Sequence, residues 1–206
     1  MYKCFFKRLF DLILSGIALI VLSPIYIVLY VLVRHYMGSP VLFKQERVGK
    51  NKKKFYLMKF RTMTDARDAD GNILPDSERL SRFGAWLRNS SLDELPEIVN
   101  IFKGDMSIIG PRPLYERYNP FFTEKELDRF RVRGGLIPPE TLYGNPNPTW
   151  DEQLGYEGEY GRNVCFFTDL KILIKVFQIL IRRNKTEYGS TERNSLDVER
   201  KKILIL

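Results

Sequence analysis

The chain has 206 residues, 44% of them apolar, which is enough for one compact domain with its own core and too little for two full domains. Its formal charge of +8 lies at the start, where residues 1–61 carry twelve Lys or Arg against two acidic residues; the remainder is net acidic, which argues against a nucleic-acid-binding domain. Cys4 and Cys165 are too few and too far apart for a disulfide scaffold or a zinc cluster, and a single His35 excludes catalysis that needs two histidines.

The first predicted element is an uncharged run from Leu12 to Val33. As a helix it would be about 33 Å long, enough to cross a hydrocarbon core of roughly 30 Å. Ser23-Pro24 lies at its middle, where proline removes a backbone hydrogen bond and predicts a kink. Ser23 could donate to the carbonyl that Pro24 frees.

Positive charge flanks this run on both sides, whereas a spanning helix usually shows an asymmetry. We therefore expect a re-entrant membrane hairpin over residues 1–38, with both ends on one face and anionic lipid as a partner. An ordinary signal anchor is the main alternative. A cleaved signal peptide is disfavoured, because the run is too long and lacks a small-residue cleavage site.

A catalytic domain is expected over residues 39–184. It begins with two strand-like stretches, Pro40 to Gln45 and Phe55 to Met63, joined by a basic turn, which predict a small β-hairpin. In the second stretch Lys59 and Arg61 alternate with apolar residues, so both cations would project from one face. They could hold phosphates or form an ordinary solvated face.

The following elements predict an α+β fold that is mostly helical. We expect a surface loop over 65–76, helices over 77–87, 94–102 and 121–133, and a short buried strand over 106–109. A final helix, Phe166 to Arg183, has its charged residues on one stripe, which suits a helix lying in a membrane interface or one packed on the core. The polar tail, residues 185–206, has little to bury and should be loosely ordered.

Adjacent carboxylates, Asp93 and Glu94, stand at the predicted start of a helix in Ser91-Leu92-Asp93-Glu94-Leu95-Pro96. One interpretation is a capping box, because Ser91 and Glu94 have its spacing, although Pro96 would then lie deep in the helix. The other is chemical: an ionised carboxylate at a helix N-terminus can attack phosphorus or bind a divalent cation. Both roles belong to phosphoryl transfer.

Two further cations are candidates for phosphate binding. Arg112 lies between Pro111 and Pro113, which force an extended backbone and present the guanidinium rigidly. Arg88 lies just upstream of the carboxylates. For Arg112, a structural turn with an exposed arginine is the alternative.

Together these segments resemble the small monotopic phosphoglycosyl transferases, which start bacterial glycan assembly. The resemblance rests on seven motifs that occur in order between residues 7 and 113: Lys7-Arg8-Leu9-Phe10-Asp11, Ser23-Pro24, Gln45-Glu46-Arg47-Val48-Gly49, Lys59-Phe60-Arg61-Thr62-Met63, Ser91-Leu92-Asp93-Glu94-Leu95-Pro96, Lys103-Gly104-Asp105-Met106-Ser107 and Gly110-Pro111-Arg112-Pro113. Each is weak alone, but their order and spacing are specific.

The resemblance implies that a sugar phosphate passes from a nucleotide diphosphate sugar to a polyprenyl phosphate. Asp93 would attack the β-phosphorus and hold the sugar phosphate as an acyl phosphate, and Glu94 would assist with Mg²⁺ and the acceptor. Lys59, Arg61, Arg88 and Arg112 would contact phosphates. Family habit suggests a uridine diphosphate (UDP) sugar and undecaprenyl phosphate, at the cytoplasmic face of the bacterial inner membrane.

The pattern departs from that family after Arg133-Gly134-Gly135, where Asn145 falls at the place of an expected arginine. This puts one phosphate or sugar contact in doubt, so the donor sugar and the glycan pathway stay open, as does homodimer formation. Glu157 replaces a family aspartate, and Asp169 is interpreted as structural. A catalytically silent scaffold that binds anionic lipid is the competing hypothesis from another class of protein.

Overall fold

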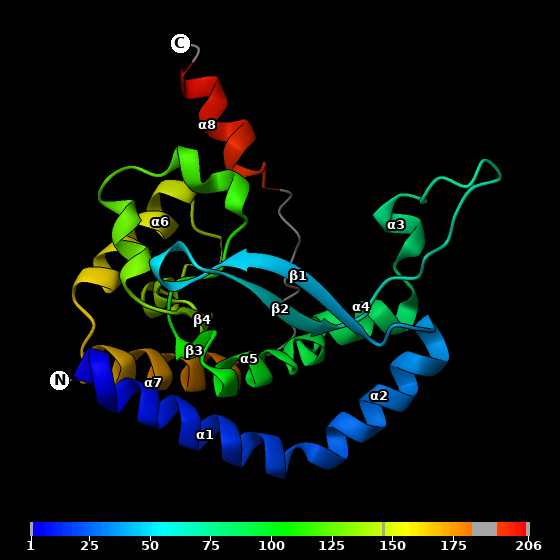
Figure 1. The fold of residues 1–206 in the computed structure, drawn as a ribbon, viewed down its shortest axis with the longest axis horizontal. Coiled ribbons are helices and arrows are strands. Elements are labelled where there is room, and N and C mark those ends of the chain that lie inside the picture. Colours follow the sequence, from blue (N-terminus) through cyan, green and yellow to red (C-terminus); the bar gives the residue numbers. More distant parts are fainter. Residues whose placement is uncertain (1, 146, 183–192, 205–206) are drawn as a thin grey trace.

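The computed structural model describes residues 2–145, 147–182 and 193–204. It is mostly helical, as the sequence predicts, and it contains two small sheets, of which the sequence predicts only the hairpin (Figure 1). The longest helices are α1 (Lys7–Val21), α2 (Ser23–Met37), α6 (Trp150–Arg162) and α7 (Phe166–Arg182). Shorter helices are α3 (Asp76–Arg79), α4 (Arg82–Asn89), α5 (Glu97–Lys103) and α8 (Leu196–Leu204).

The two sheets have two strands each. Strands β1 (Leu42–Val48) and β2 (Lys54–Phe60) form the predicted antiparallel hairpin, with Leu42 opposite Phe60 and Val48 opposite Lys54. The buried strand predicted over 106–109 is β3 (Met106–Ile109), which pairs in parallel with β4 (Gly134–Ile137). That pairing requires Gly135, because a side chain there would collide with the backbone of Gly110.

Helices α1 and α2 meet at a bend of 64° and diverge from it as an open V (Figure 1). The predicted kink is confirmed, and the hydroxyl of Ser23 donates to the carbonyl of Ile20 at 2.7 Å. Pro24 cannot supply this bond from its nitrogen, so the serine replaces it. Among the described residues no single helix is long and apolar enough to cross a membrane, whereas this bent pair together has the length and composition.

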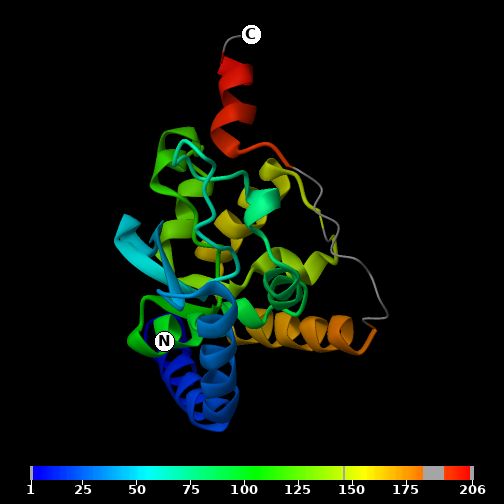
Figure 2. The same ribbon diagram turned by 90° about the vertical axis from the view of Figure 1, so that its right-hand side faces the viewer.

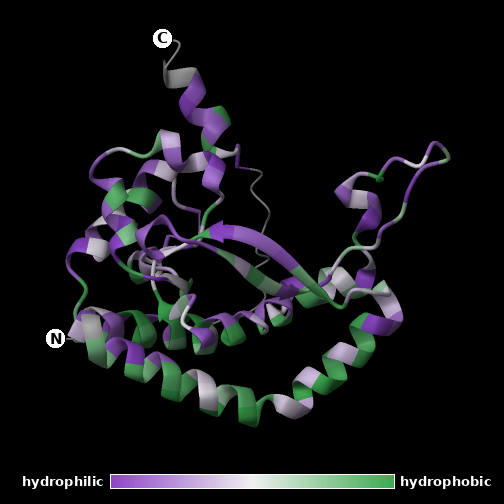
Figure 3. Ribbon diagram, viewed as in Figure 1, coloured by the Kyte–Doolittle hydropathy of each residue, from purple (hydrophilic) through white to green (hydrophobic). Residues whose placement is uncertain are grey.

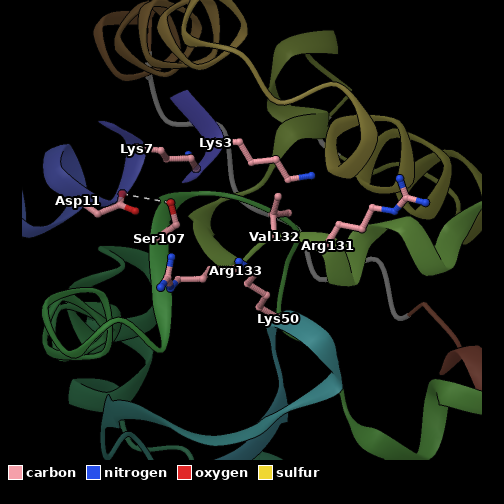
Figure 4. Close-up of a pocket in the computed structure, with 8 residues that line it drawn as sticks. All are labelled: Lys3, Lys7, Asp11, Lys50, Ser107, Arg131, Val132 and Arg133. Carbon is pink, nitrogen blue, oxygen red and sulfur yellow. Dashed lines mark hydrogen bonds between the residues drawn. The ribbon is translucent and has the colours of Figure 1, made fainter. Parts of the chain in front are cut away.

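Helix α1 presents its polar side to the protein. Its buried residues are Lys7, Asp11 and Ser15, spaced four apart on one face, while most of the apolar residues on its other faces are exposed. Asp11 accepts hydrogen bonds from the hydroxyl of Ser107 (3.1 Å; Figure 4) and the amide of Ile108 (2.9 Å). A helix that buries its charges and exposes its apolar side chains is the reverse of a soluble amphipathic helix.

Asp169 links the N-terminal segment to the helices at the other end of the chain. It is buried and accepts hydrogen bonds from Tyr2 (2.6 Å), Lys7 (2.7 Å) and Tyr160 (2.5 Å). These bonds join the start of α1, helix α6 and helix α7, and they agree with the structural role predicted for Asp169.

Helix α2 packs on the domain through Leu29, Val33 and Met37, in a core cluster with Phe60 and Leu87. The partly buried Leu92 and Leu95 pack against the same cluster. In addition, the hydroxyl of Tyr26 donates to the carbonyl of Leu95. The apolar N-terminal segment therefore supports the stretch of chain that carries Asp93 and Glu94.

One helix prediction is wrong. Residues 121–133 do not form an α-helix: the short 3₁₀ segment η4 (Glu116–Phe121) ends where the predicted helix would begin, and a second one, η5 (Glu126–Arg131), lies within it. Tertiary ion pairs override the helical pattern, because Glu126 turns to Arg200 (2.7 Å) and Arg129 turns to Glu157 (2.7 Å), both in the interior.

The polar tail is also better packed than its composition predicts. Residues 185–192 lie outside the described residues, but Leu196, at the start of α8, is fully buried and Arg200 pairs with Glu126 and Asp151. The expected loose order is therefore wrong for residues 193–204. Two other predicted helices differ in their bounds. The helix predicted over 77–87 is divided into α3 and α4, and the helix predicted over 94–102 begins later, as α5.

Candidate active site

The predicted carboxylates lie on the 3₁₀ segment η3 (Leu92–Glu94), between α4 and α5. Ser91 precedes it with φ 56° and ψ 18°, in the left-handed region, and its side chain caps nothing. The capping-box interpretation therefore fails. Instead the chain turns sharply at Ser91, Leu92 and Leu95 pack into the core, and Asp93 is held between them at 8% exposure.

Lys59 is the cation nearest to this segment. It projects from β2, and its ammonium lies 2.6 Å from Oε1 of Glu94 and 3.3 Å from Oε1 of Glu97. Burial lowers the pKa of Lys59, but the two carboxylates outweigh that effect and leave the pKa raised. The ammonium is thus firmly protonated and fixed between two acidic side chains.

Asp93 is the more strongly desolvated of the two predicted carboxylates. Burial raises its pKa above the ordinary value, Lys59 opposes the shift, and the neighbouring Glu94 adds to it. Arg88 also favours the ionised form. The expected stabilisation by a helix N-terminus is not the main influence here, because η3 has only three residues and α5 begins at Glu97.

Glu97 is a third acidic residue of the site that the sequence reading missed. It is 5% exposed, and burial raises its pKa to about 7, with Lys59 and Arg112 opposing the shift and Glu94 increasing it. The local signal was its position directly after Pro96, at the first residue of α5. That a carboxylate there points inward depends on the packing of α5 against β2.

A buried amide fixes this packing. The side chain of Asn100 on α5 accepts from the amide of Met58 (3.0 Å) and donates to the carbonyl of Tyr56 (2.8 Å), so it pairs with β2 as a neighbouring strand would. Asn100 lies almost one helical turn beyond Glu97, and Lys59 follows Met58. The two bonds therefore set Lys59 over the start of α5.

The four predicted phosphate contacts do not all lie together. Lys59, Arg88 and Arg112 act electrostatically on the carboxylates, and the side chains of Arg88 and Arg112 are exposed. Arg61 is buried instead: its guanidinium donates to the carbonyls of Ser39 and Met63 at 2.9 Å each and pairs with Asp65. The structure thus gives Arg61 bonds that brace the chain after β2.

The main chain of Arg112 is clamped by a buried ion pair. Its amide donates to Oε1 of Glu157 (2.9 Å), and its carbonyl accepts from Nη2 of Arg129 (2.5 Å). The same Nη2 lies 2.7 Å from Oε2 of Glu157, and Gln153 donates to Oε1 at 3.1 Å. This clamp holds the peptide groups on both sides of Arg112 and leaves the guanidinium exposed.

The region that departs from the family pattern adds one more buried acid. Glu140 is 8% exposed, and burial together with Glu157 raises its pKa to about 8. Asn145 is exposed and its side-chain oxygen accepts from the amide of Asn147. A cation does lie close by. Nζ of Lys175, on α7, would be 3.4 Å from a Cβ atom placed on Gly144, the residue before Asn145.

A metal site built from protein side chains alone is absent from the described residues, where no three His, Cys, Asp or Glu side chains are grouped for it. Mg²⁺ commonly needs only one or two carboxylates when substrate phosphates complete its shell. Glu94 contacts Lys59 through Oε1 and is one-third exposed. Asp93 and Glu94 together supply the two carboxylates that Mg²⁺ needs when substrate phosphates provide its other ligands.

The chain matches the family described as bacterial sugar transferase over residues 2–183. It is 41% identical over 194 residues to the uncharacterized sugar transferase EpsL of Bacillus subtilis, covering 94% of both chains. It is 34% identical to a UDP-glucose:undecaprenyl-phosphate glucose-1-phosphate transferase of Klebsiella pneumoniae, covering 89% of this chain and 41% of that one. It is 30% identical to a UDP-N-acetylgalactosamine-undecaprenyl-phosphate N-acetylgalactosaminephosphotransferase of Aeromonas hydrophila, covering 86% of this chain and 44% of that one.

Proposed function

Because the chain belongs to the bacterial sugar transferase family, we propose that it transfers a sugar 1-phosphate from a UDP-sugar to undecaprenyl phosphate. The names of the Klebsiella and Aeromonas relatives describe this reaction with two different sugars. They support the reaction class and leave the donor sugar open. Such a product would start the assembly of a bacterial glycoconjugate.

The first step uses Asp93 as nucleophile. A carboxylate oxygen of Asp93 forms a bond to the β-phosphorus of the UDP-sugar, the bond between that phosphorus and the bridging oxygen breaks, and uridine monophosphate (UMP) leaves with the electron pair. The sugar phosphate stays on Asp93 as an acyl phosphate. The observation that carries this step is the buried position of Asp93, at 8% exposure, beside Lys59 and Arg88.

In the second step an oxygen of undecaprenyl phosphate attacks the same phosphorus. The bond to Asp93 breaks, and the carboxylate is restored as the lipid diphosphate sugar forms. The Asp93 carboxylate and the lipid phosphate are both anionic, and each attacks a phosphoryl group that is itself anionic. The site must therefore reduce the repulsion between attacking group and target. Lys59, Arg88 and the clamped Arg112 supply fixed positive charge, which is the main catalytic resource in phosphoryl transfer.

Mg²⁺ is the cofactor that this chemistry favours, and Asp93 and Glu94 would hold it together with the diphosphate. When bound, it would neutralise charge on the phosphates and on the leaving UMP. Lys59 orients Glu94 through the 2.6 Å contact. Glu97 would stay near this centre as a buried acid whose proton is lost close to neutral pH.

We also propose that α1 and α2 enter the membrane as a re-entrant element. The candidate active site would then lie at the cytoplasmic face of the membrane. Exposed residues of α1 and α2 are largely apolar, and the bend lies at the far point from the domain (Figure 3). Helix α7 lies above the level of that bend (Figure 2). Its exposed Phe167, Phe177 and Ile181 suit the membrane interface.

The experiment is an assay of UMP release by the purified protein with Mg²⁺ and a panel of UDP-sugars, with and without undecaprenyl phosphate. Sustained release that requires the lipid and one particular sugar supports the proposal and names the donor. The Asp93→Asn variant should release no UMP. A fully active variant, or no release with any donor, would contradict it.

A further inference from the structure

The C-terminal segment, residues 193–204, contains α8 and is attached to the domain at its beginning (Figure 1). Leu196 is fully buried and packs in one core cluster with Leu114 and Trp150. The indole nitrogen of Trp150 donates to the carbonyl of Asn194 at 3.0 Å. The match to the bacterial sugar transferase family ends at residue 183, so family membership assigns no role to this segment.

Arg193 fastens the C-terminal segment to the start of α6. Its Nη1 donates to the carbonyl of Pro148 at 2.9 Å and to Oε1 of Gln153 at 3.1 Å. Its Cζ lies 3.7 Å from the centroid of the Trp150 ring, a distance at which a guanidinium gains a cation–π attraction. Three groups of the domain therefore fix the position of this one side chain.

Gln153 carries the attachment into the interior of the domain, where it is 5% exposed. Its oxygen accepts from Arg193, and its Nε2 donates to Oε1 of Glu157 at 3.1 Å. The same Oε1 accepts from the amide of Arg112 at 2.9 Å. Because one end of the glutamine amide meets a cation and the other an anion, only this orientation satisfies both. Three hydrogen bonds in series thus join Arg193 to the main chain of Arg112.

A second connection runs through η5. Arg200 on α8 pairs with Glu126 at 2.7 Å, and Glu126 is the first residue of η5. Arg129, on the same 3₁₀ segment, donates to the carbonyl of Arg112. The C-terminal segment therefore reaches the amide of Arg112 through Gln153 and its carbonyl through η5.

We propose that the C-terminal segment holds Arg112 in the position from which it contacts a phosphate of the donor, and that Arg193 is a positioning residue for this contact. The catalytic effect rests on the proposed transfer reaction, whereas the hydrogen-bonded link does not. Arg112 has an exposed side chain whose charge acts on the buried Glu97 of the candidate active site. A fixed cation stabilises phosphoryl transfer only while its backbone is held in place, because a shift of about 1 Å can cost a large part of the rate.

Hydrogen–deuterium exchange of the full chain in neutral detergent tests the link without any substrate. Pro111 and Pro113 have no amide hydrogen, so exchange in this stretch reports the amide of Arg112 alone. The variants are Arg193→Ala, the conservative Arg193→Lys, and the matched control Lys201→Ala, which removes a positive charge from an exposed position on α8.

We expect the Arg112 amide to exchange about tenfold faster in Arg193→Ala and at the wild-type rate in Lys201→Ala. Arg193→Lys should restore most of the protection, because an ammonium can still donate to the oxygen of Gln153. Gln153→Leu breaks the series of hydrogen bonds from inside the domain, and it should expose the same amide while the amides of α8 stay protected. Wild-type exchange in both Arg193→Ala and Gln153→Leu would overturn the link.

A double-mutant cycle on UMP release tests the positioning role. Arg193→Ala should lower kcat/KM about tenfold in the wild-type background and by less than about twofold in an Arg112→Ala background, because a residue that acts through Arg112 then has nothing to position. Equal losses in the two backgrounds would show a merely structural role and overturn the assignment. The exchange experiment uses no substrate, so failure of the link and failure of the transfer reaction give different results.

Discussion

Arg129 and Glu157 form an ion pair of 2.7 Å in the interior of the domain and together grip the main chain of Arg112. Their side chains are 2% and 0% exposed. A buried pair of this kind contributes little by its own attraction, but removing one partner leaves a charge without compensation. Its value here is positional, since it fixes the arginine that faces the candidate active site.

Glu157→Gln is therefore expected to be strongly destabilising. The glutamine can still accept from the Arg112 amide, but Arg129 loses its counter-charge, so the free energy of unfolding should fall by about 3 to 5 kcal/mol. Urea unfolding measures this. The control is Asp76→Asn, which breaks the exposed pair with Arg79 and should change stability by less than about 1 kcal/mol. An equal loss of unfolding free energy in the two variants would contradict the prediction, because it would show that the buried pair contributes no more than an exposed one.

Lys59 and Arg61 are expected to separate catalysis from stability. Lys59→Ala removes the cation between Glu94 and Glu97, so kcat/KM should fall at least 100-fold, about 2.7 kcal/mol in the transition state. Arg61→Ala removes donors from two backbone carbonyls and should cost about 2 kcal/mol of folding stability. UMP release at saturating and limiting donor, together with Tm, distinguishes them. A Lys59→Ala variant with unchanged kcat/KM would remove Lys59 from the site.

Glu97 should make stability depend on pH near neutrality. Its pKa is raised from 4.5 to about 7 on folding, so between these values the folded protein holds a proton that the unfolded chain loses. The free energy of unfolding then decreases as pH rises from 4.5 through 7, by up to about 3 kcal/mol.

Glu97→Gln carries no titrating proton and should lose this dependence. The measurement is the Tm of wild type and variant at pH 5 and pH 8, with Glu124→Gln, an exposed glutamate, as control. The wild type and the control should lose more Tm at pH 8 than Glu97→Gln does. The prediction fails when all three proteins show the same change.

The bend at Pro24 is expected to determine which face of the membrane the N-terminus occupies. Replacing Ser23 and Pro24 by alanine allows a continuous helix from Lys7 to Met37, about 46 Å long, which favours a spanning segment. Cysteines at residues 2 and 38, in a background without Cys4 and Cys165, can be probed with an impermeant thiol reagent on spheroplasts.

When Ser23 and Pro24 are retained, both introduced cysteines should be protected from the reagent. When both residues are replaced by alanine, one of the two cysteines should become labelled. Labelling of one cysteine in the starting protein would contradict the re-entrant proposal. Protection of both in the double variant would show that the bend does not decide the topology.

Local signals carried the sequence predictions that are confirmed. Ser23-Pro24 predicted the kink, the basic turn predicted the β1–β2 hairpin, and the ordered motifs predicted membership of the bacterial sugar transferase family. Each depends on residues adjacent in the chain. Proline geometry and turn chemistry act over a few residues, so they can be read without knowledge of the tertiary structure.

The missed features depend on residues far apart in sequence. Glu157 is 45 residues from Arg112, and no periodicity marks their contact. Similarly, the charged pattern of 121–133 reads as a helix because the ion pair of Glu126 with Arg200 is invisible in one segment. The buried stripe of Lys7, Asp11 and Ser15 was visible as spacing, but only the fold shows that it faces the domain.

The central claim is that Asp93 becomes covalently bonded to the sugar phosphate, and isotope exchange tests it most directly. Labelled UMP and the active UDP-sugar are incubated with the protein and Mg²⁺ in the absence of undecaprenyl phosphate, with Asp93→Asn and Arg61→Lys beside it. A covalent intermediate predicts label entering the UDP-sugar with wild type and Arg61→Lys, and none with Asp93→Asn. No exchange by a wild-type protein that still releases UMP when the lipid is added would contradict the claim and favour direct transfer between the two substrates.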